Sequence, residues 1–417
     1  MIAFVTALFA ALGLPLFIAI SALAIYNFYV AEIDLTVLSI EMYRIAETPT
    51  LTAIPLFAFA GFILAESKAP NRLVECSKAL LGWLPGGLGI MALVVCALFT
   101  SLTGASGMTI VALGGLLFPA LQKANYDERF SLGLLTTSGS LGLLFPPSLP
   151  LIIYGIVAQT PIDDLFIAGI LPGLLLVGSL SVYAYLYGRR HIPTTPRTTA
   201  KQALQPLRES FWELILPFII LGGIFSGTIA LSEAAVLCAT YVLIVEMLIK
   251  REISLGDIPR IIRECMVLVG GIFIILAAAM AYTSFLIDAQ IPNQLLQAIS
   301  EHIESKLLFL ILLNVFLLVV GCMLDMFSAL ILVVPLILPI AQAYEVHPVH
   351  LGIIFLTNLE IGYSTPPIGL NLFIASMRFG KPILTLYIAS LPYLAIMLVC
   401  LVLVTYLPVL SLFFLTP

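Results

Sequence analysis

The stretch NLEIGYSTPPIGLNLF (358–373) lies between two of the most apolar runs of a 417-residue chain. It places Asn358, Glu360, Thr365 and a Pro-Pro pair in a segment whose surroundings should lie in hydrocarbon. Proline removes a backbone donor and clashes with the preceding turn, so these residues predict a helix that is broken at membrane depth. Non-helical backbone is tolerated at that depth only where protein or water satisfies its polar groups.

The composition of the chain indicates a polytopic membrane protein. Apolar residues make up 61% of it and charged residues 10%, and the mean hydropathy is +1.15. This leaves too little polar surface to cover a soluble globule. We therefore expect an all-α protein with several membrane-spanning helices. Six scattered cysteines without CxxC spacing indicate neither a disulfide framework nor a zinc site.

Two apolar segments are too long for a single crossing of the membrane. Segment 86–122 is interrupted by SLTGASG (101–107), and segment 306–343 is interrupted by GCMLDMFS (321–328). Small residues at each interruption allow the backbone to bend. Each segment is therefore expected to form a re-entrant hairpin of two half-length helices.

The two halves of the chain repeat a pattern at a fixed offset. Residues 220 positions apart match at several places: Thr137 with Thr357, Gly142 with Gly362, Pro146 with Pro366, and Pro147 with Pro367. In addition, APNRLVE (69–75) is similar to IPNQLLQ (291–297), just before each expected hairpin. Such repetition is typical of transporters built from structural repeats.

Basic residues predict how the chain is oriented. The loop 188–210 carries five Lys or Arg residues against one Glu, which indicates a flexible cytoplasmic linker. Counting crossings from this linker sends the first hairpin in from the cytoplasmic side and the second from the external side. The sequence therefore predicts two inverted repeats: residues 1–187 with a hairpin at about 86–122 and a broken helix at 131–157, and residues 211–417 with a hairpin at about 306–343 and a broken helix at 349–376.

The two breaks predict two cation sites. Na+ is a hard cation that favours oxygen ligands, and transporters bind it at unwound carbonyl groups and half-helix C-termini. At the first break the candidate ligands are Ser106, Ser138, Ser140, Gly142 and Pro146, and at the second they are Asp325, Asn358, Gly362 and Thr365. For any one serine, a hydroxyl bonded to the backbone of its own helix is the alternative.

Three charged residues have two open interpretations each. Asp325 is either a cation ligand or the N-cap of the second hairpin helix, and one role does not exclude the other. Glu360 is either a proton carrier, which would couple transport to H+, or a structural carboxylate, since its counterpart Ser140 carries no charge. Arg378 either binds a substrate carboxylate through bidentate hydrogen bonds or serves as a cytoplasmic anchoring charge.

Four segments resemble one known family. TGASGMTIVALGGLLFPAL, LGLLTTSGSLGLLFPPSLPLIIYG, DLFIAGILPGLLL and HLGIIFLTNLEIGYSTPPIGLNLFIAS are similar to the large membrane subunit of tripartite ATP-independent periplasmic (TRAP) transporters. The resemblance implies uptake of an organic acid by Na+ symport, with a transport domain of hairpins and broken helices that moves like an elevator against a scaffold.

The same resemblance implies two partners and a location. The partners are a small four-helix membrane subunit and a periplasmic binding protein that delivers the substrate, and the location is the bacterial inner membrane. The family's small-residue tip of the first hairpin corresponds here to Gly104, Ser106 and Gly107 with Ala105 between them. We expect the substrate to meet this tip, together with Thr365 at the second break.

Other classes of function find little support in the sequence. The four histidines are expected in loops, and HExxH, GxSxG and GxxxxGK[ST] motifs are absent, so we expect no enzyme, no ATP use and no nucleic-acid partner. The closest alternative is a stand-alone Na+- or H+-coupled divalent-anion symporter of the same superfamily. The sequence does not specify the substrate.

Overall fold

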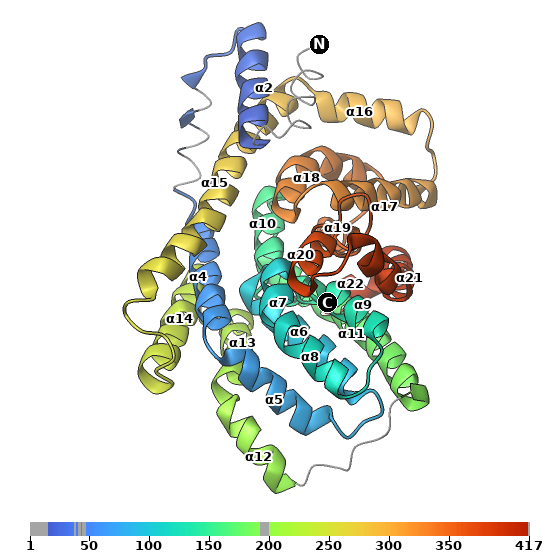
Figure 1. The fold of residues 1–417 in the computed structure, drawn as a ribbon. Helices are drawn as coiled ribbons and strands as arrows, with labels where there is room; N and C mark the ends of the chain where they lie inside the picture. The colour runs from blue at the N-terminus through green and yellow to red at the C-terminus, as the bar shows by residue number, and fades with distance from the viewer. Residues whose placement is uncertain (1–15, 37–38, 41–42, 44–46, 192–199, 416–417) are drawn as a thin grey trace.

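The computed structural model describes residues 16–36, 39–40, 43, 47–191 and 200–415, and all regular structure within these ranges is helical (Figure 1). Among these residues, six helices are long and apolar enough to cross a membrane, or up to eight if each of two bent helix pairs counts as one span. The predicted all-α polytopic membrane protein is therefore confirmed.

The described helices fall in two halves, one before residue 192 and one from residue 200 onward. The first half contains α2 (Leu16–Val30), the short 3-10 helix η1 (Pro49–Thr52), α4 (Ala53–Glu66), α5 (Ala69–Leu81), α6 (Gly87–Thr103), α7 (Ser106–Ala112), α8 (Gly114–Lys123), α9 (Glu128–Ser138), η2 (Leu141–Leu144), α10 (Leu149–Val157) and α11 (Ile162–His191). The second half contains α12 (Ala200–Glu209), α13 (Phe211–Phe225), α14 (Leu231–Leu243), the π-helix η3 (Ile244–Ile249), α15 (Ile258–Asp288), α16 (Ile291–Ser300), α17 (Lys306–Met323), α18 (Met326–Ala343), α19 (Pro348–Gly362), α20 (Leu370–Phe379), α21 (Ile383–Tyr406) and α22 (Val409–Leu412).

Both Pro-Pro motifs separate two helical pieces. In the first half, residues Glu128–Leu144 and Leu149–Val157 are bent by 47° relative to each other around the first motif. In the second half, α19 and α20 are separated by residues 363–369, which contain the second motif. The Pro146–Pro147 and Pro366–Pro367 peptide bonds are both cis. Each helix ends here because proline supplies no amide to continue it.

The helices gather in two groups (Figure 1). Helices α4, α14 and α15 pack together with α2 along one side of the molecule, while the hairpins and the broken helices fill the other side. The amphipathic helices α5 and α16, which the sequence pairs as counterparts, lie at opposite ends of the molecule (Figure 1).

The structure corrects the expectation of a flexible linker at 188–210, because helical residues occupy both ends of this segment. Residues up to His191 continue α11, and Ala200–Glu209 form α12, while 192–199 lie outside the described residues. The reason is composition, because the Pro and Thr residues concentrate before residue 200. The sequence AKQALQPLRE that follows consists mainly of strong helix formers.

A buried charge cluster, which the sequence did not reveal, joins α5 to α13 and to the end of α14. The guanidinium of Arg72 forms ion pairs with Glu213, Glu246 and Glu252, and its Nη2 lies 2.7 Å from Oε1 of Glu246. The π-helix η3 carries Glu246 into this cluster. Buried charges are tolerated only when they are paired, so Arg72 is the counter-charge that lets these glutamates lie inside the protein.

Candidate functional site

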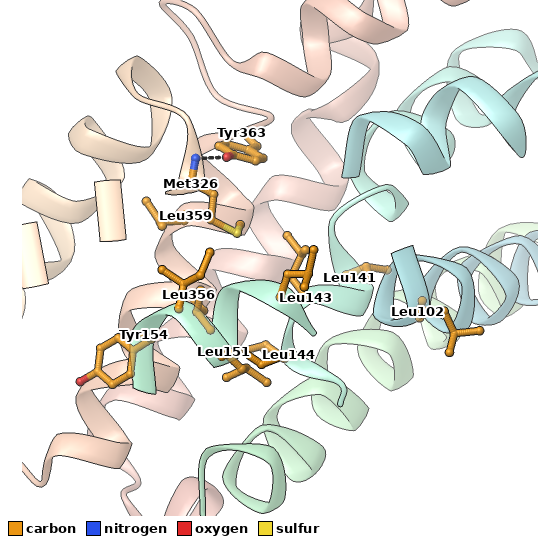
Figure 2. Packing of buried hydrophobic residues seen from close by; sticks show 14 of the residues in the cluster. Leu102, Leu141, Leu143, Leu144, Leu151, Tyr154, Met326, Leu356, Leu359 and Tyr363 are labelled. Atoms are coloured by element: carbon orange, nitrogen blue, oxygen red, sulfur yellow. Dashed lines mark hydrogen bonds between the residues drawn. The ribbon is translucent and has the colours of Figure 1, made fainter. Parts of the chain in front are cut away.

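The tip of the second hairpin is seated on the second helix break. The amide of Met326, at the start of α18, donates a hydrogen bond to the hydroxyl of Tyr363 (Figure 2). The amide of Gly369 donates to the carbonyl of Cys322 at 3.1 Å. The hairpin thus supplies partners for backbone that has left its helix, as irregular backbone at membrane depth requires.

Both breaks approach the first arm of a hairpin through a glycine. A methyl group added at Gly362 would lie 2.6 Å from the carbonyl carbon of Gly321 on α17. A methyl group added at Gly142 would lie 2.6 Å from the amide nitrogen of Ser101 on α6. Ser101 and Gly321 are themselves 220 residues apart, so the contact recurs at equivalent positions in both halves. Glycine is required at each break because no side chain fits between the backbones.

The tip of the first hairpin lies at the first break. The hydroxyl of Thr100 donates to the carbonyl of Gly139 at 2.9 Å, and a methyl group at Gly139 would lie 3.2 Å from the carbonyl oxygen of Ser106. The side chain of Ser106 turns toward the second half, where its hydroxyl donates to Oδ1 of Asn371 on α20 at 2.9 Å. The first tip therefore touches both broken helices.

The two broken helices meet at Ser140 and Glu360. The hydroxyl of Ser140 donates to the carbonyl of Glu360 at 3.4 Å. Around this contact, Leu143 and Leu144 of η2 lie next to Leu356 and Leu359 of α19 (Figure 2). The breaks therefore lie together within an apolar core.

Glu360 is fully buried at this crossing. Within the described ranges its carboxyl oxygens have no hydrogen-bond partner and no ion pair, although they interact with the backbone amide of Leu144. An arginine partner is thus missing among the described residues, while the interaction with Leu144 of the other broken helix fits a structural carboxylate at a contact between the two halves. The proton-carrier interpretation stays a prediction.

Asp325 caps α18. Its Oδ1 accepts from the amides of Phe327 and Ser328 at 3.0 Å each, and the Ser328 hydroxyl donates to Oδ2. The N-cap interpretation is therefore confirmed. Asp325 is exposed at the tip, and its carboxylate has further lone pairs for a ligand, so the cap leaves room for a cation. Its role as a cation ligand stays a prediction.

Apart from Ser106, which donates to Asn371, the hydroxyl groups expected at the cation sites are bonded to their own helices. Ser138 and Ser140 each donate to the carbonyl three residues earlier at 3.4 Å, and Thr365 donates to the carbonyl of Ile361 at 2.8 Å. For Ser138 and Ser140, the alternative of a hydroxyl bonded to the backbone of its own helix is thus present in the structure. Each of these hydroxyl oxygens retains lone pairs for a ligand.

The backbone carbonyls at the two breaks are partly used. Those of Gly142 and Gly362 accept from the amides three residues later, at 3.0 and 2.9 Å. Pro146 lies buried in the first break. Asn358 differs from the other candidates because its Oδ1 is fully buried and has no hydrogen-bond partner in the ranges that the structure covers.

A pocket of about 640 Å³ opens beside the first hairpin tip. Gly107 and Arg378 both line it, and Glu66 of α4 and Glu264 of α15 line the opposite side. The guanidinium of Arg378 lies against the backbone of the first hairpin, since a methyl group at Gly115 would overlap its Nη2. Two of the predicted substrate-binding residues therefore share one pocket.

The other predicted substrate-binding residues lie outside that pocket. The pocket lining does not include Gly104, Ser106 or Thr365. Gly104 has φ +65°, and a side chain there would meet Leu149 at 2.6 Å, so its place is set by the turn of the hairpin.

Sequence reasoning missed several buried polar residues near the second break. The expectation that all histidines lie in loops is wrong for His350, which is buried within α19. The helix begins at Pro348, and Pro is typical of a first helical position, so this signal could have placed His350 in a helix. Asn314 and Thr405 lay within apolar runs without a motif, and Asn371 lay inside the stretch 358–373 but was not proposed as a site residue.

Comparisons with known proteins identify relatives over most of the chain. The family described as tripartite ATP-independent periplasmic transporter, DctM component, matches residues 2–410. The C4-dicarboxylate TRAP transporter large permease protein DctM of Pseudomonas aeruginosa is 36% identical over 376 residues, which cover 90% of this chain and 88% of that protein. The isethionate TRAP transporter permease protein DctMQ of Oleidesulfovibrio alaskensis is 33% identical over 419 residues, which cover 98% of this chain and 65% of that protein.

A solved structure shows a similar fold. The YdaH transporter of Alcanivorax borkumensis, whose structure is described as having an unusual topology, matches with a TM-score of 0.58 and 15% identity, covering 89% of this chain and 87% of that one. At this identity the likeness concerns the fold alone. The match along residues 2–410 and the 36% identity identify the family directly: the chain belongs to the DctM component of the TRAP transporters, and it is a large permease, not an enzyme.

Proposed function

We propose that this large permease takes up an organic acid by Na+ symport, with the substrate delivered by a periplasmic binding protein. The names of two relatives, for C4-dicarboxylates and for isethionate, support an organic anion as substrate. The observation that carries the proposal is the seating of two hairpin tips on two helix breaks. This arrangement brings unwound backbone and half-helix ends together at two places, as cation-coupled transporters do.

Three observations support inverted repeats with boundaries near 1–187 and 211–417. The glycine contacts at Gly142 and Gly362 recur 220 residues apart. Ser140 touches Glu360, its own counterpart, and equivalent residues of a two-fold repeat meet only near the axis that relates the repeats. Finally, α5 and α16 lie at opposite ends of the molecule (Figure 1).

Na+ would bind at the two breaks. At the second break, the buried Oδ1 of Asn358 is an amide oxygen of the kind that hard cations prefer, and the Asp325 carboxylate lies at the adjoining tip. At the first break, the carbonyl groups near Ser140 and Gly142 are the corresponding ligands. Glu360 is the group that would carry a proton if H+ replaced Na+ at this crossing.

Substrate binding and movement follow from the spaces beside the breaks. The guanidinium of Arg378 would bind a carboxylate or sulfonate in the pocket of about 640 Å³ that lies between the first hairpin, α20, α4 and α15. A second space, of about 600 Å³, lies between the α10–α11 connection and helices α13 to α15. Both spaces separate hairpin and broken-helix elements from the other group of helices. This supports an elevator in which the former are the transport domain and the latter belong to the scaffold.

The partners follow from the family and from one relative. TRAP systems contain a small membrane subunit and a binding protein, and the DctMQ name marks a relative in which M and Q components form one chain. Family membership thus favours a binding-protein-dependent system in the bacterial inner membrane over the stand-alone symporter.

Reconstitution would test the proposal. The chain would be copurified with a small membrane subunit from its native host and placed in proteoliposomes, and binding proteins encoded beside it would be added. Uptake of labelled dicarboxylates and sulfonates would then be compared under Na+, K+ and pH gradients. We expect uptake only with an inward Na+ gradient and a binding protein. Uptake driven by a pH gradient without Na+, or without any binding protein, would refute this mechanism.

A further inference from the structure

A chain of buried polar side chains connects the last helix to the second break. Its members come from four helices and each is at most 8% exposed: Ser411 of α22, His350 and Asn358 of α19, Thr405 of α21 and Asn314 of α17. Within an otherwise apolar core, such groups are retained only when they are hydrogen-bonded. Each link therefore constrains the next.

The outer end of the chain is fixed by His350. The carbonyl of Thr405 lies in the last turn of α21, where helix carbonyls lack intrahelical partners. Nε2 of His350 is 3.2 Å from this carbonyl, which can only accept, so Nε2 donates. In the neutral ring Nδ1 then accepts from the hydroxyl of Ser411 at 3.1 Å. His350 thus holds the end of α21 in place.

The middle of the chain is the pair Thr405 and Asn314. Nδ2 of Asn314 donates to the Thr405 hydroxyl oxygen at 3.1 Å, and Oδ1 of Asn314 accepts from Nδ2 of Asn358 at 2.8 Å. The Thr405 hydroxyl also donates to Oδ1 of Asn314 at 3.3 Å, so it contacts both polar atoms of the amide and holds Asn314 against α21.

The inner end of this series of hydrogen-bonded side chains is Asn358. Nδ2 of Asn358 also donates to the carbonyl of Ile354 at 2.8 Å, so both of its N–H groups are used. Turning this amide round would place its oxygen against the Ile354 carbonyl, which can only accept, so Nδ2 is held on that side. Oδ1 of Asn358 is left as a buried acceptor without a partner in the part of the chain that the structure describes. Leaving a buried acceptor of this kind unsatisfied is unfavourable, and a bound cation would offset that cost.

The equivalent positions of the first half lack this support. Residues 220 positions before Asn314 and Asn358 are Val94 and Ser138. Valine has no polar atom, and the Ser138 hydroxyl bonds to its own helix. The polar chain is thus particular to the second break.

We propose that Asn314, held by Thr405, is a positioning residue that orients Asn358 so that its Oδ1 binds the cation at the second break. The inference rests on the proposed Na+ symport. Without Asn314, Nδ2 of Asn358 keeps only the Ile354 carbonyl as partner, and the side chain is free to turn its oxygen away from the break.

The test compares variants of the full chain. Asn314→Leu removes both amide contacts, Thr405→Val removes the hydroxyl with little change of volume, and Thr405→Ser restores the hydroxyl. Asn358→Ala removes the ligand itself. Ser390→Ala, on the same helix as Thr405, is the control, because Ser390 is equally buried and has no hydrogen-bond partner among the described residues.

The readout is the NaCl concentration that gives half-maximal thermal stabilisation, with choline chloride added to constant ionic strength. We expect Asn314→Leu to raise this concentration about tenfold, which corresponds to about 1.4 kcal/mol. Thr405→Val should raise it about threefold, while Thr405→Ser and Ser390→Ala stay within about twofold of the wild type. The maximal stabilisation at saturating NaCl should remain in the positioning variants, which a general folding defect would not allow.

Two outcomes would overturn the inference and can be told apart. If Asn358→Ala abolishes the Na+ response but Asn314→Leu and Thr405→Val leave it unchanged, the site stands and the positioning role is wrong. If Asn358→Ala itself leaves the response unchanged, the cation ligand and the positioning role both fail. Should Asn314→Leu fail to fold, the contrast between Thr405→Val and Thr405→Ser decides.

Discussion

Replacing Gly362 with alanine should separate the second hairpin from its break. The added methyl group would lie 2.6 and 2.7 Å from the carbonyl carbon and Cα of Gly321, and 2.9 Å from the amide nitrogen of Cys322. All three are backbone atoms, so no side chain can turn away and α17 itself must move. Overpacking typically costs about 1–3 kcal/mol, and a backbone clash belongs at the upper end of that range. The loss of glycine's flexibility returns about 0.5–1 kcal/mol, so we expect a net destabilisation of about 2 kcal/mol.

Thermal unfolding of the purified protein and Na+-dependent uptake would measure the effect. Gly178→Ala on α11 is the matched control, because a methyl group there meets nothing within 4 Å. We expect it to unfold at or slightly above the wild-type temperature, since alanine is the better helix former. Gly142→Ala should behave like Gly362→Ala, because its methyl group would lie 2.2 Å from the carbonyl oxygen of Ala97.

The comparison can refute the reasoning in two ways. Equal unfolding temperatures for Gly362→Ala and Gly178→Ala would show that the hairpin does not pack closely on the break. A destabilised Gly362→Ala with unaltered Na+-dependent uptake would show that the contact serves stability alone.

Three further predictions concern single side chains. Asp325→Ala should lower stability by about 1 kcal/mol through the lost cap and weaken Na+ activation of uptake, whereas Asp325→Asn keeps the cap; wild-type Na+ activation in Asp325→Asn would contradict a charged ligand. Arg378→Lys should raise the KM for substrate about tenfold in uptake assays, since lysine cannot bind a carboxylate bidentately; an unchanged KM would leave Arg378 as an anchoring charge. The six native cysteines are buried, so introduced cysteines can report the orientation. Asp163→Cys should react with an external thiol reagent, while Ser254→Cys and Thr195→Cys should resist it; Thr195 lies outside the described residues. The reverse pattern would contradict the orientation.

The breaks and hairpin bends could be predicted because the residues that cause them are local. A Pro-Pro pair stops a helix wherever it occurs, and Asp325 before an apolar run indicates a cap, so neither needs a distant partner. Asn358 could be singled out only because it is a polar residue within an apolar segment. Its partner Asn314 lies 44 residues before it, and Thr405, the partner of Asn314, lies 47 residues after it; only the packed fold selects which faces of α17 and α21 meet α19. The ion pairs of Arg72 stayed hidden for the same reason, because Glu213 and Glu246 are 141 and 174 residues away.

The two halves use one backbone design but different side chains, so the two proposed cation sites should not be equal. At the first break the Ser138 hydroxyl is bonded to its own helix, the Ser140 hydroxyl is shared between its own helix and the Glu360 carbonyl, and the nearby carboxyl group is that of Glu360 from the other half. At the second break a neutral amide, Asn358, presents a fixed oxygen. A site with a buried carboxyl depends on whether that group is ionised, while a site with an amide does not. Protonation of Glu360 should therefore weaken Na+ binding at the first break and leave binding at the second, where the proposed ligands are Asn358 and the exposed Asp325, unchanged.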